Sequence, residues 1–304
     1  MTDLRRRVLT ALALDRTPGF TYSGNFLGVR FPSSTPDCVC VQMDEGDHCE
    51  DEHGQADIGA VSLLADVAMA SVVRARLSPE QRLATVSLTL QFTGEPLVGA
   101  LEGRGEFEAF IDGADSRQGL SRGSLTAGGR PVLFGSGAFM VMNPPPGRTM
   151  HPIVDAVHAN VVPPGEQELE AHEREVLGRA DRAIEAAAGA RGFLKHFWGF
   201  LPVATPDGAR CRTANGAHIG NRVGHMQGGL QIGMAIATAG AALPAGWAVS
   251  GISAWFMSPG EGDEIEANAR VEHRGRNTAV VRTVITGVGG RRVLEAMSTH
   301  VRKA

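Results

Sequence analysis

The second half of this chain repeats its first half, which limits the fold to a duplicated unit. Residues 51–59 read DEHGQADIG and residues 221–229 read NRVGHMQGG, and an apolar stretch follows each segment. The glycines keep their spacing, so the two segments align at a constant offset of 170 residues. This period matches a whole small domain and is too long for one unit of a solenoid. We therefore predict a duplicated domain.

One acidic residue has no counterpart in the repeat. Asp66 lies within the first apolar stretch, and its counterpart in the second stretch is Ile236. Two copies of one scaffold thus carry different polar groups. This difference predicts a division of labour between the halves.

The repeat continues on both sides of these segments. Phe26–Gly28 resembles Phe197–Gly199, and Leu101–Gly103 lines up with Ile265–Ala267 at an offset of 164. The change in offset indicates short insertions or deletions, which surface loops tolerate at little cost.

Composition narrows the class of protein. With 304 residues the chain can build two cores, and its formal net charge of −4 is mild. It has no basic stripe that favours nucleic acid, no apolar run of ~18 residues that favours a membrane span, and no signal-peptide pattern. The four cysteines lack metal-ligand spacing. We expect free thiols, a cytoplasmic location and no metal.

Hydrophobic periodicity predicts the helices and strands of the chain and their order. We predict helices over 1–15, 58–77, 166–190 and 228–243, and strands over 38–44, 84–93, 100–111, 119–127, 132–142, 209–214, 247–257, 264–273, 278–287 and 292–302. The run Pro144–Gly147 breaks the chain. We expect an N-terminal domain over 1–145, a linker with a surface helix over 146–190, and a C-terminal domain over 191–304.

An apolar helix followed by an antiparallel meander occurs twice in this order. That order is typical of an α+β domain in which a helix lies on a curved sheet.

The residues at the start of each apolar stretch match a known motif. The motif has Asn, Gly three residues later, then His-Gly-Gly, and Asp nine residues after the His. The second half has Asn221, Gly224 and Gln227–Gly229, with Gln in place of His and Ile236 in place of the acid.

The first half holds the complementary part of the motif. It has Asp51, Gly54 and Asp57–Gly59, followed by the acid Asp66. The segment 271–276, VEHRGR, is also similar to the stretch that precedes the last two strands in the same family. On these residues the chain resembles the hotdog-fold acyl-CoA thioesterases of the phenylacetate-pathway (PaaI-like) type, in a tandem, double hotdog form.

The resemblance implies two tandem hotdog domains, each a long central helix wrapped by an antiparallel sheet. It implies acyl-CoA as the substrate, with coenzyme A entering as part of the substrate and no separate cofactor. The oligomeric state stays open, although exposed sheet edges would allow two such double units to pair as a homodimer.

Helix geometry predicts how the two halves share a site. Nine residues of a helix rise ~13.5 Å, so a helix start and an acid nine residues later cannot both touch one substrate atom. If the two helices pack antiparallel, the start of one lies near the middle of the other. Asp66 then meets Asn221, Gln227 and Gly228.

The opposite end of such a pair lacks the same chemistry. There Asp51 and Asp57 at a helix start face the hydrocarbon of Ile236. We therefore expect one working site per chain and a vestigial second end.

Thioester hydrolysis explains why these residue types are needed. Unpaired N–H groups near Gly228 and Gly229 can stabilise the negative charge that develops on the carbonyl oxygen. Gln227 or Asn221 can add an amide donor or orient a water. Asp66 would act as general base, or as a nucleophile that forms a mixed anhydride.

Two arginines complete the set of candidates. Arg274 and Arg276 follow a predicted strand and are candidates for binding the phosphates of coenzyme A, since guanidinium groups suit phosphate.

Each candidate also has an ordinary structural interpretation. Asp66 can be an exposed helix carboxylate, Asn221 and Gln227 can be loop and cap residues, and the glycines can serve close packing. The two arginines can be solvated, and His53 and His225, which flank the motifs, can be structural.

Two other functions stay open at this stage. A hotdog enoyl-CoA hydratase or dehydratase would need an acid–histidine pair, for which His53 and His225 are the candidates. A non-catalytic acyl-CoA binding module is the other alternative, because neither half keeps the histidine of the motif.

Overall fold

The computed structural model describes residues 3–17, 19–143, 161–187 and 191–303. The first half contains α1 (Asp3–Asp15), α2 (Tyr22–Leu27), β1 (Arg30–Ser34), β2 (Cys38–Met43), α3 (Ile58–Arg74), β3 (Arg82–Phe92), β4 (Leu101–Asp112), β5 (Arg117–Ala127) and β6 (Arg130–Met142). The second half contains the 3₁₀ turn η2 (Glu166–Glu168), α4 (Ala171–Ala186), α5 (Phe193–Trp198), β7 (Val203–Thr205), β8 (Gly208–Ala214), α6 (Gly228–Ala241), β9 (Trp247–Phe256), β10 (Glu264–Arg274), β11 (Thr278–Thr286), the 3₁₀ turn η3 (Val288–Gly290) and β12 (Arg292–Arg302). Within the described residues, no helix is long and apolar enough to cross a membrane.

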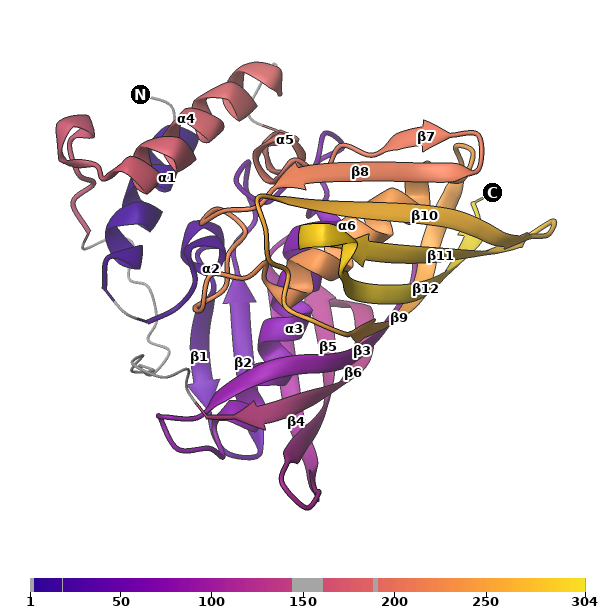
Figure 1. The fold of residues 1–304 in the computed structure, drawn as a ribbon, viewed down its shortest axis with the longest axis horizontal. Coiled ribbons are helices and arrows are strands. Elements are labelled where there is room, and N and C mark those ends of the chain that lie inside the picture. Colours follow the sequence, from indigo (N-terminus) through magenta and orange to yellow (C-terminus); the bar gives the residue numbers. More distant parts are fainter. Residues whose placement is uncertain (1–2, 18, 144–160, 188–190, 304) are drawn as a thin grey trace.

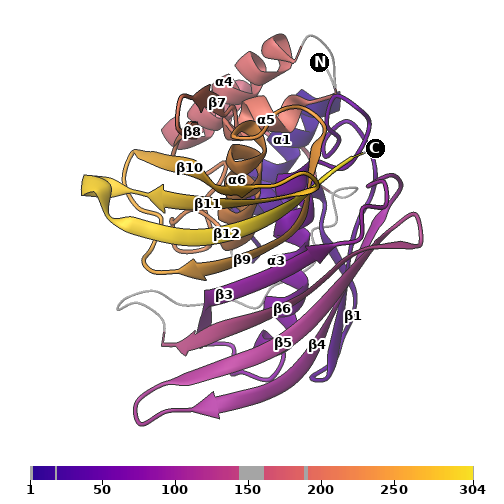
Figure 2. The same ribbon diagram turned by 90° about the vertical axis from the view of Figure 1, so that its right-hand side faces the viewer.

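The strands form one continuous antiparallel sheet of 12 strands, in the order β1-β2-β4-β5-β6-β3-β9-β12-β11-β10-β8-β7. The halves join where β3 pairs with β9, with Leu88 opposite Ala254. The sheet curves around α3 and α6, as Figures 1 and 2 show. The resulting fold is α+β, as predicted.

The central helices form because their sequences are apolar and their starts are capped. Asp57 caps α3 by accepting a hydrogen bond from the N–H of Gly59, and Gln227 caps α6 by accepting one from the N–H of Leu230, both at 2.8 Å. Helix α3 ends at Arg74, three residues before the predicted end. Most residues of both helices are buried between the sheet and the other helices.

Helices α3 and α6 pack antiparallel and in very close contact. A Cβ added to Gly229 would lie 2.5 Å from the Cα of Leu63, and one added to Gly233 would lie 2.5 Å from the Cα of Gly59. Gly229 faces Leu63, whereas Gly233, four residues later on α6, faces Gly59, four residues earlier on α3. The two helices therefore run in opposite directions. Only glycine permits this approach, because any side chain would collide with backbone.

Two six-residue helices were missed by the sequence prediction. Helices α2 and α5 are repeat counterparts, and each ends at a glycine in the left-handed region, Gly28 (φ 69°) and Gly199 (φ 73°). Their aromatic side chains meet between the halves, with Phe26 and Phe193 at a ring-centroid distance of 5.7 Å. So short a helix is marginal in isolation, and tertiary packing stabilises it.

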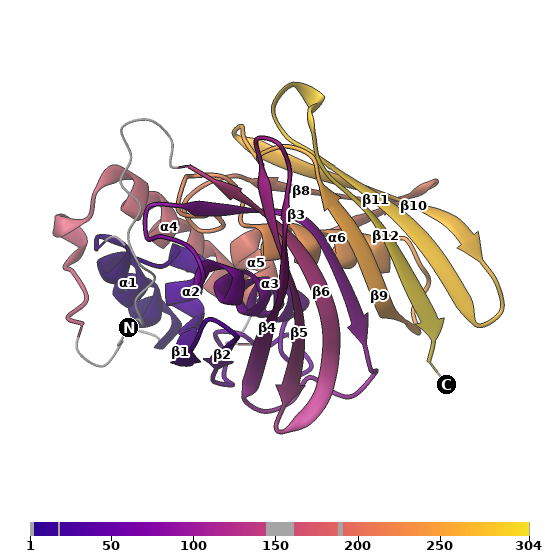
Figure 3. The same ribbon diagram turned by 90° about the horizontal axis from the view of Figure 1, so that it is seen from below.

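Helices α1 and α4 lie side by side, away from the sheet (Figures 1 and 3). Residues Glu166–Glu168, predicted to begin the long helix, form a 3₁₀ turn instead, and α4 starts at Ala171. The predicted break at Pro144–Gly147 lies outside the described residues, and the proposed division into domains stays a prediction.

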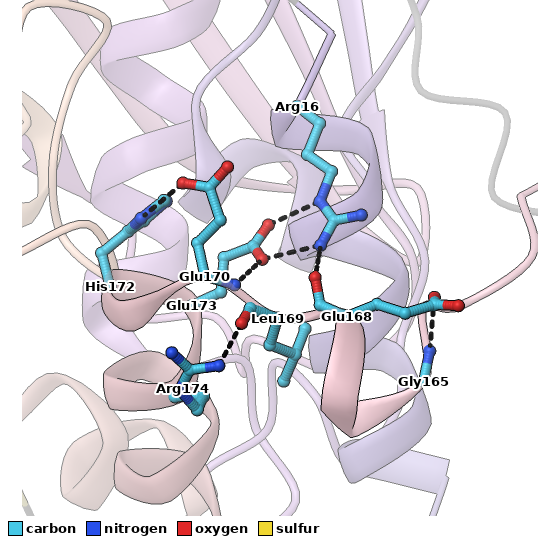
Figure 4. Close-up of polar contacts among 8 residues, drawn as sticks. All are labelled: Arg16, Gly165, Glu168, Leu169, Glu170, His172, Glu173 and Arg174. Carbon is cyan, nitrogen blue, oxygen red and sulfur yellow. Dashed lines mark hydrogen bonds and ion pairs between the residues drawn. The ribbon is translucent and has the colours of Figure 1, made fainter.

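A half-buried ion pair joins the residue that follows α1 to helix α4 (Figure 4). Arg16 donates two hydrogen bonds of 2.7 Å to the carboxylate of Glu173, whose side chain is only 3 % exposed. The bond from Arg16 is the main reason that the pKa of Glu173 falls to about 2. This ionised pair fixes the two helices against each other.

Replacing Glu173 with glutamine is expected to lower the free energy of unfolding by ~2 kcal/mol at pH 7, because Arg16 loses its charged partner. The folded-state pKa lies below the unfolded value, so the carboxylate stabilises the fold above pH ~4.3 and ceases to do so as pH falls toward 2. Urea unfolding should therefore show a smaller difference in the free energy of unfolding between the wild type and Glu173→Gln at pH 3 than at pH 7. Glu168→Gln, at an exposed position, is the control; an equal effect there would contradict the prediction.

Candidate active site

Asp66 of the first half contacts the start of helix α6 of the second half. Its Oδ2 accepts hydrogen bonds from Nε2 of Gln227 at 2.9 Å and from the backbone N–H of Gly229 at 3.1 Å. The Asp66 side chain is buried, at 5 % exposure. The structure thus places Asp66 against the helix of the other half, in the geometry expected for antiparallel packing.

Thr85 is a further contact of this carboxylate. It lies on β3, and its hydroxyl donates a hydrogen bond of 3.2 Å to Oδ1 of Asp66. Sequence reasoning missed Thr85, because nothing in its strand pattern distinguishes it from neighbouring threonines. The donors to Oδ2 are an amide and a backbone N–H, whereas Oδ1 accepts from a hydroxyl.

Burial makes Asp66 more basic than an ordinary carboxylate. Loss of solvent raises its pKa from 3.8 to about 6, and the hydrogen bonds from Thr85, Gly229 and Gln227 oppose part of that rise. A carboxylate with this pKa is ionised at neutral pH and is a better proton acceptor than an exposed one.

Gly228 is the first residue of α6 and lies beside Asp66. A Cβ at this position would be 3.2 Å from Oδ2 of Asp66 and 3.1 Å from Oγ1 of Thr85. Among the described residues, no hydrogen-bond acceptor for the Gly228 N–H is found. The N–H groups of the next two residues do have acceptors: that of Gly229 donates to Asp66, and that of Leu230 donates to the side chain of Gln227. Gly228 therefore offers a free donor at a helix start.

These groups line one cavity of about 430 Å³. Its wall is built by α3, β3, β6, the loop before α6, the start of α6 and the end of β9. The residues that line it are Phe20, Thr21, Asp66, Val67, Ala70, Ser71, Arg74, Arg82, Leu83, Ala84, Thr85, Val86, Phe139, Met140, Met142, Asn221, Arg222, Val223, His225, Met226, Gln227, Gly228, Gln231, Phe256, Met257, Ser258, Pro259 and Gly260.

Of the predicted residues, Asp66, Asn221, Gln227 and Gly228 line this cavity, and Gly229 lies directly behind it as a donor to Asp66. Asn221 has a structural task as well. Its Oδ1 accepts hydrogen bonds from the N–H groups of Val223 (3.0 Å) and His225 (3.1 Å) and closes the loop. Asp51 closes the corresponding loop of the first half through the N–H groups of His53 and Gln55.

The opposite end of the helix pair is built differently. Asp57 uses its carboxylate to cap its own helix, and Ile236 is buried. The indole of Trp198 lies against the start of α3, so that a Cβ on Gly59 would be 2.6 Å from its Cζ3. The repeat counterpart of Trp198 in the first half is Leu27, whose side chain is smaller than the indole. The start of α3 is therefore covered by a bulky ring.

Arg274 and Arg276 are not among the residues that line the cavity. They lie exposed, at the end of β10 and in the turn before β11. Phosphate binding by these two arginines stays a prediction. Three other arginines, which sequence reasoning did not select, line the cavity instead: Arg74, Arg82 and Arg222.

The two flanking histidines differ in position. His225 lines the cavity, with its Nε2 3.0 Å from a carboxylate oxygen of Glu261. His53 is exposed in the loop of the first half. Neither forms a hydrogen bond to Asp66 in the part of the chain that the structure describes.

Sequence comparisons do not identify the chain: no family model matches it, and no curated protein matches it. Solved structures do resemble it. A putative oleoyl thioesterase from Lactobacillus plantarum is 10% identical, with a TM-score of 0.55, and the match covers 91% of this chain and 99% of that one.

Two further solved structures give similar figures. A conserved protein with a hot dog fold from Alicyclobacillus acidocaldarius is 11% identical, with a TM-score of 0.51 and coverage of 91% and 96%. A 12:0-ACP thioesterase from Umbellularia californica is 10% identical, with a TM-score of 0.52 and coverage of 88% and 94%. At these identities the likeness shows the fold, which is the hotdog fold over about 90% of the chain.

Proposed function

We propose that this protein is a hydrolase that cleaves acyl-CoA thioesters at one composite site between two tandem hotdog units. The observation that carries the proposal is the contact of Asp66, from one half, with Gln227 and Gly229 at the helix start of the other half, in the wall of an open cavity. The fold that the chain shares with solved thioesterases supports the same reaction class.

The free donor at the start of α6 suits the charge that develops during hydrolysis. A thioester carbonyl beside Gly228 would accept a hydrogen bond from its N–H, and the partial positive charge of the helix start would stabilise the oxyanion. Because Gly228 has no side chain, the carbonyl can come close to the backbone.

Asp66 then supplies the base. It takes a proton from a water, the water oxygen attacks the carbonyl carbon, and the tetrahedral intermediate collapses by breaking the C–S bond. The proton held by Asp66 passes to the leaving thiolate, so the products are a carboxylic acid and a thiol. Direct attack by Asp66 would instead give a mixed anhydride, which hydroxylamine would trap in a single turnover.

The proposal is tested by assaying a panel of acyl-CoAs for release of free thiol, with Asp66→Asn as the control. Hydrolysis that depends on Asp66 supports the proposal. Addition of water to crotonyl-CoA without thiol release would show a hydratase in its place. Tight binding of acyl-CoA with no turnover would show a binding module.

The rate of hydrolysis is expected to depend on pH through Asp66. The base works only when ionised and its pKa is about 6, so kcat/KM should rise roughly tenfold per unit below pH 6 and level off above it. The groups that contact the carboxylate, Thr85, Gln227 and Gly229, do not titrate in this range. A profile that stays flat from pH 5 to 7.5 would rule out a base of this pKa.

A further inference from the structure

Three arginines converge on the cavity that holds Asp66. Arg74 is the last residue of α3, Arg82 the first of β3, and Arg222 lies in the loop before α6; all three are half-buried. Among the residues of the wall that the structure describes, the other ionisable ones are Asp66 and His225. Cations therefore outnumber anions in the wall.

Neutral groups hold two of these arginines in place. Arg74 donates to the backbone carbonyl of Gln81 at 2.7 Å, and Arg82 donates to that of Asn143 at 3.2 Å. Within the described residues, neither forms an ion pair with a carboxylate. Burial, and then the nearby charge of Arg74, lower the pKa of Arg222 to about 10. Both guanidinium groups thus line a partly desolvated wall, where an anion would interact with them more strongly than in water.

The repeated scaffold does not require these cations. At an offset of 170, the counterpart of Arg74 is Pro244 and that of Arg222 is Glu52. Glu52 forms an ion pair of 2.7 Å with Lys195, far from the cavity residues in the fold. Arg74 and Arg222 therefore occur only at the end of the helix pair that also holds Asp66, and their repeat counterparts at the other end are not basic.

Their distance from the reacting group suits a ligand that reaches along α3. Asp66, Ala70 and Arg74 are spaced four residues apart, line one face of the helix, and span about 12 Å along its axis. In a CoA thioester about thirteen bonds separate sulfur from the first phosphorus, which is roughly 16 Å when extended. In a ten-carbon dicarboxylic acyl group the far carboxylate lies nine bonds, roughly 11 Å, from the thioester carbonyl, on the other side of the sulfur.

We propose that Arg74, Arg82 and Arg222 form an anion subsite that binds a phosphate or carboxylate of the substrate about 12 Å from the reacting carbonyl. The subsite rests on the proposed thioesterase function, since it takes its distance from Asp66. Its recognition chemistry is the guanidinium fork, which pairs with two oxygens of a phosphate or a carboxylate.

The test compares thioesters with and without each anion, in the wild type and in Arg74→Gln/Arg222→Gln. Hexanoyl-CoA against hexanoyl-pantetheine measures the contribution of the phosphates. Decanedioyl-pantetheine against decanoyl-pantetheine measures that of an acyl carboxylate, because nine bonds, roughly 11 Å, separate the two carbonyl carbons of the decanedioyl group. We expect one of these preferences in kcat/KM to fall by roughly 10–100-fold in the double variant, while turnover of hexanoyl-pantetheine is retained. The preference that falls identifies the anion.

Controls separate this subsite from the proposed function and from misfolding. Arg6→Gln, at an exposed position of α1, should change neither preference, and thermal unfolding checks that each variant is folded. Calorimetric binding of CoA, compared with pantetheine, needs no turnover, so it reports the phosphate arm even if hydrolysis is absent. The subsite is refuted if both preferences survive in the double variant, or if Arg274→Gln/Arg276→Gln removes them instead.

Discussion

Replacing Asp66 with asparagine is expected to abolish thioester hydrolysis and, at the same time, to stabilise the protein at neutral pH. Loss of the base should reduce kcat/KM by about 10²–10⁴-fold. The three hydrogen bonds can persist, because an Asn oxygen can accept from Gln227 and Gly229 while its amide donates to the hydroxyl of Thr85. The variant therefore removes a charge from a buried place without removing its contacts.

The sign and size of the stability change follow from the pKa. Folding raises the pKa of Asp66 from about 3.9 to about 6, so the folded state binds the proton more tightly. The stabilising contribution is present below pH ~4 and is lost as pH rises through 6, which leaves a cost of roughly 3 kcal/mol at pH 7. Asp66→Asn should gain up to that amount in urea unfolding at pH 7.5 and little at pH 4.

Asp57→Asn is the matched control. Asp57 also caps a helix start, and burial raises its pKa to about 6 as well. Asparagine is an equally good cap, so this variant should also gain stability at neutral pH, yet hydrolysis should continue. If both variants lost activity together, or if Asp66→Asn were destabilising at pH 7.5, the assignment of Asp66 as an ionised base in a buried site would have to be abandoned.

Replacing Gly228 with alanine is expected to lower kcat/KM by about 100-fold or more without loss of stability. The added methyl would lie 3.2 Å from Oδ2 of Asp66, 3.1 Å from Oγ1 of Thr85 and 3.5 Å from the ring of Phe256. That is the space the thioester carbonyl must enter to reach the helix start, where one oxyanion donor contributes about 10²–10³-fold. The close contacts at 3.1 and 3.2 Å cost some packing energy, which offsets the gain of roughly 0.5–1 kcal/mol that alanine brings over glycine in a helix.

Gly240→Ala provides the comparison on the same helix. A Cβ at Gly240 meets nothing within 4 Å, so it should bring the same helical gain with unchanged kinetics. Steady-state kinetics and thermal unfolding of both variants test the pair. Full activity in a folded Gly228→Ala variant would show that the substrate does not approach the start of α6.

Much of the fold could be predicted because its signals are local. Apolar periodicity and the prolines that follow α3 and α6 located both central helices, and strand alternation located β4 to β6 and β9 to β12 to within a few residues. The helices α2 and α5 were missed even though their sequences had been aligned as part of the repeat. Their structure depends on aromatic packing between the halves, which has no local period.

Part of the candidate site could also be predicted, because some of its residues carry a signal in the sequence. Asp66, Gln227 and Gly229 could be linked because the repeat and helix geometry together imply which residues meet. Thr85 and Arg82 lie on a strand that carries no repeat signal for the site. Arg222 did carry one, since it stands opposite Glu52 in the repeat as Asp66 stands opposite Ile236.

The repeated segments, the unmatched acid and the helix starts could be read from the sequence by itself, because these depend on residue order and on the period of one helix. Only the tertiary structure decided what Asp66 touches, that a tryptophan covers the opposite end, and that three arginines share its cavity. These contacts join residues as much as 163 positions apart. They depend on how closely two glycine-bearing helices approach, which is a property of packing and not of local pattern.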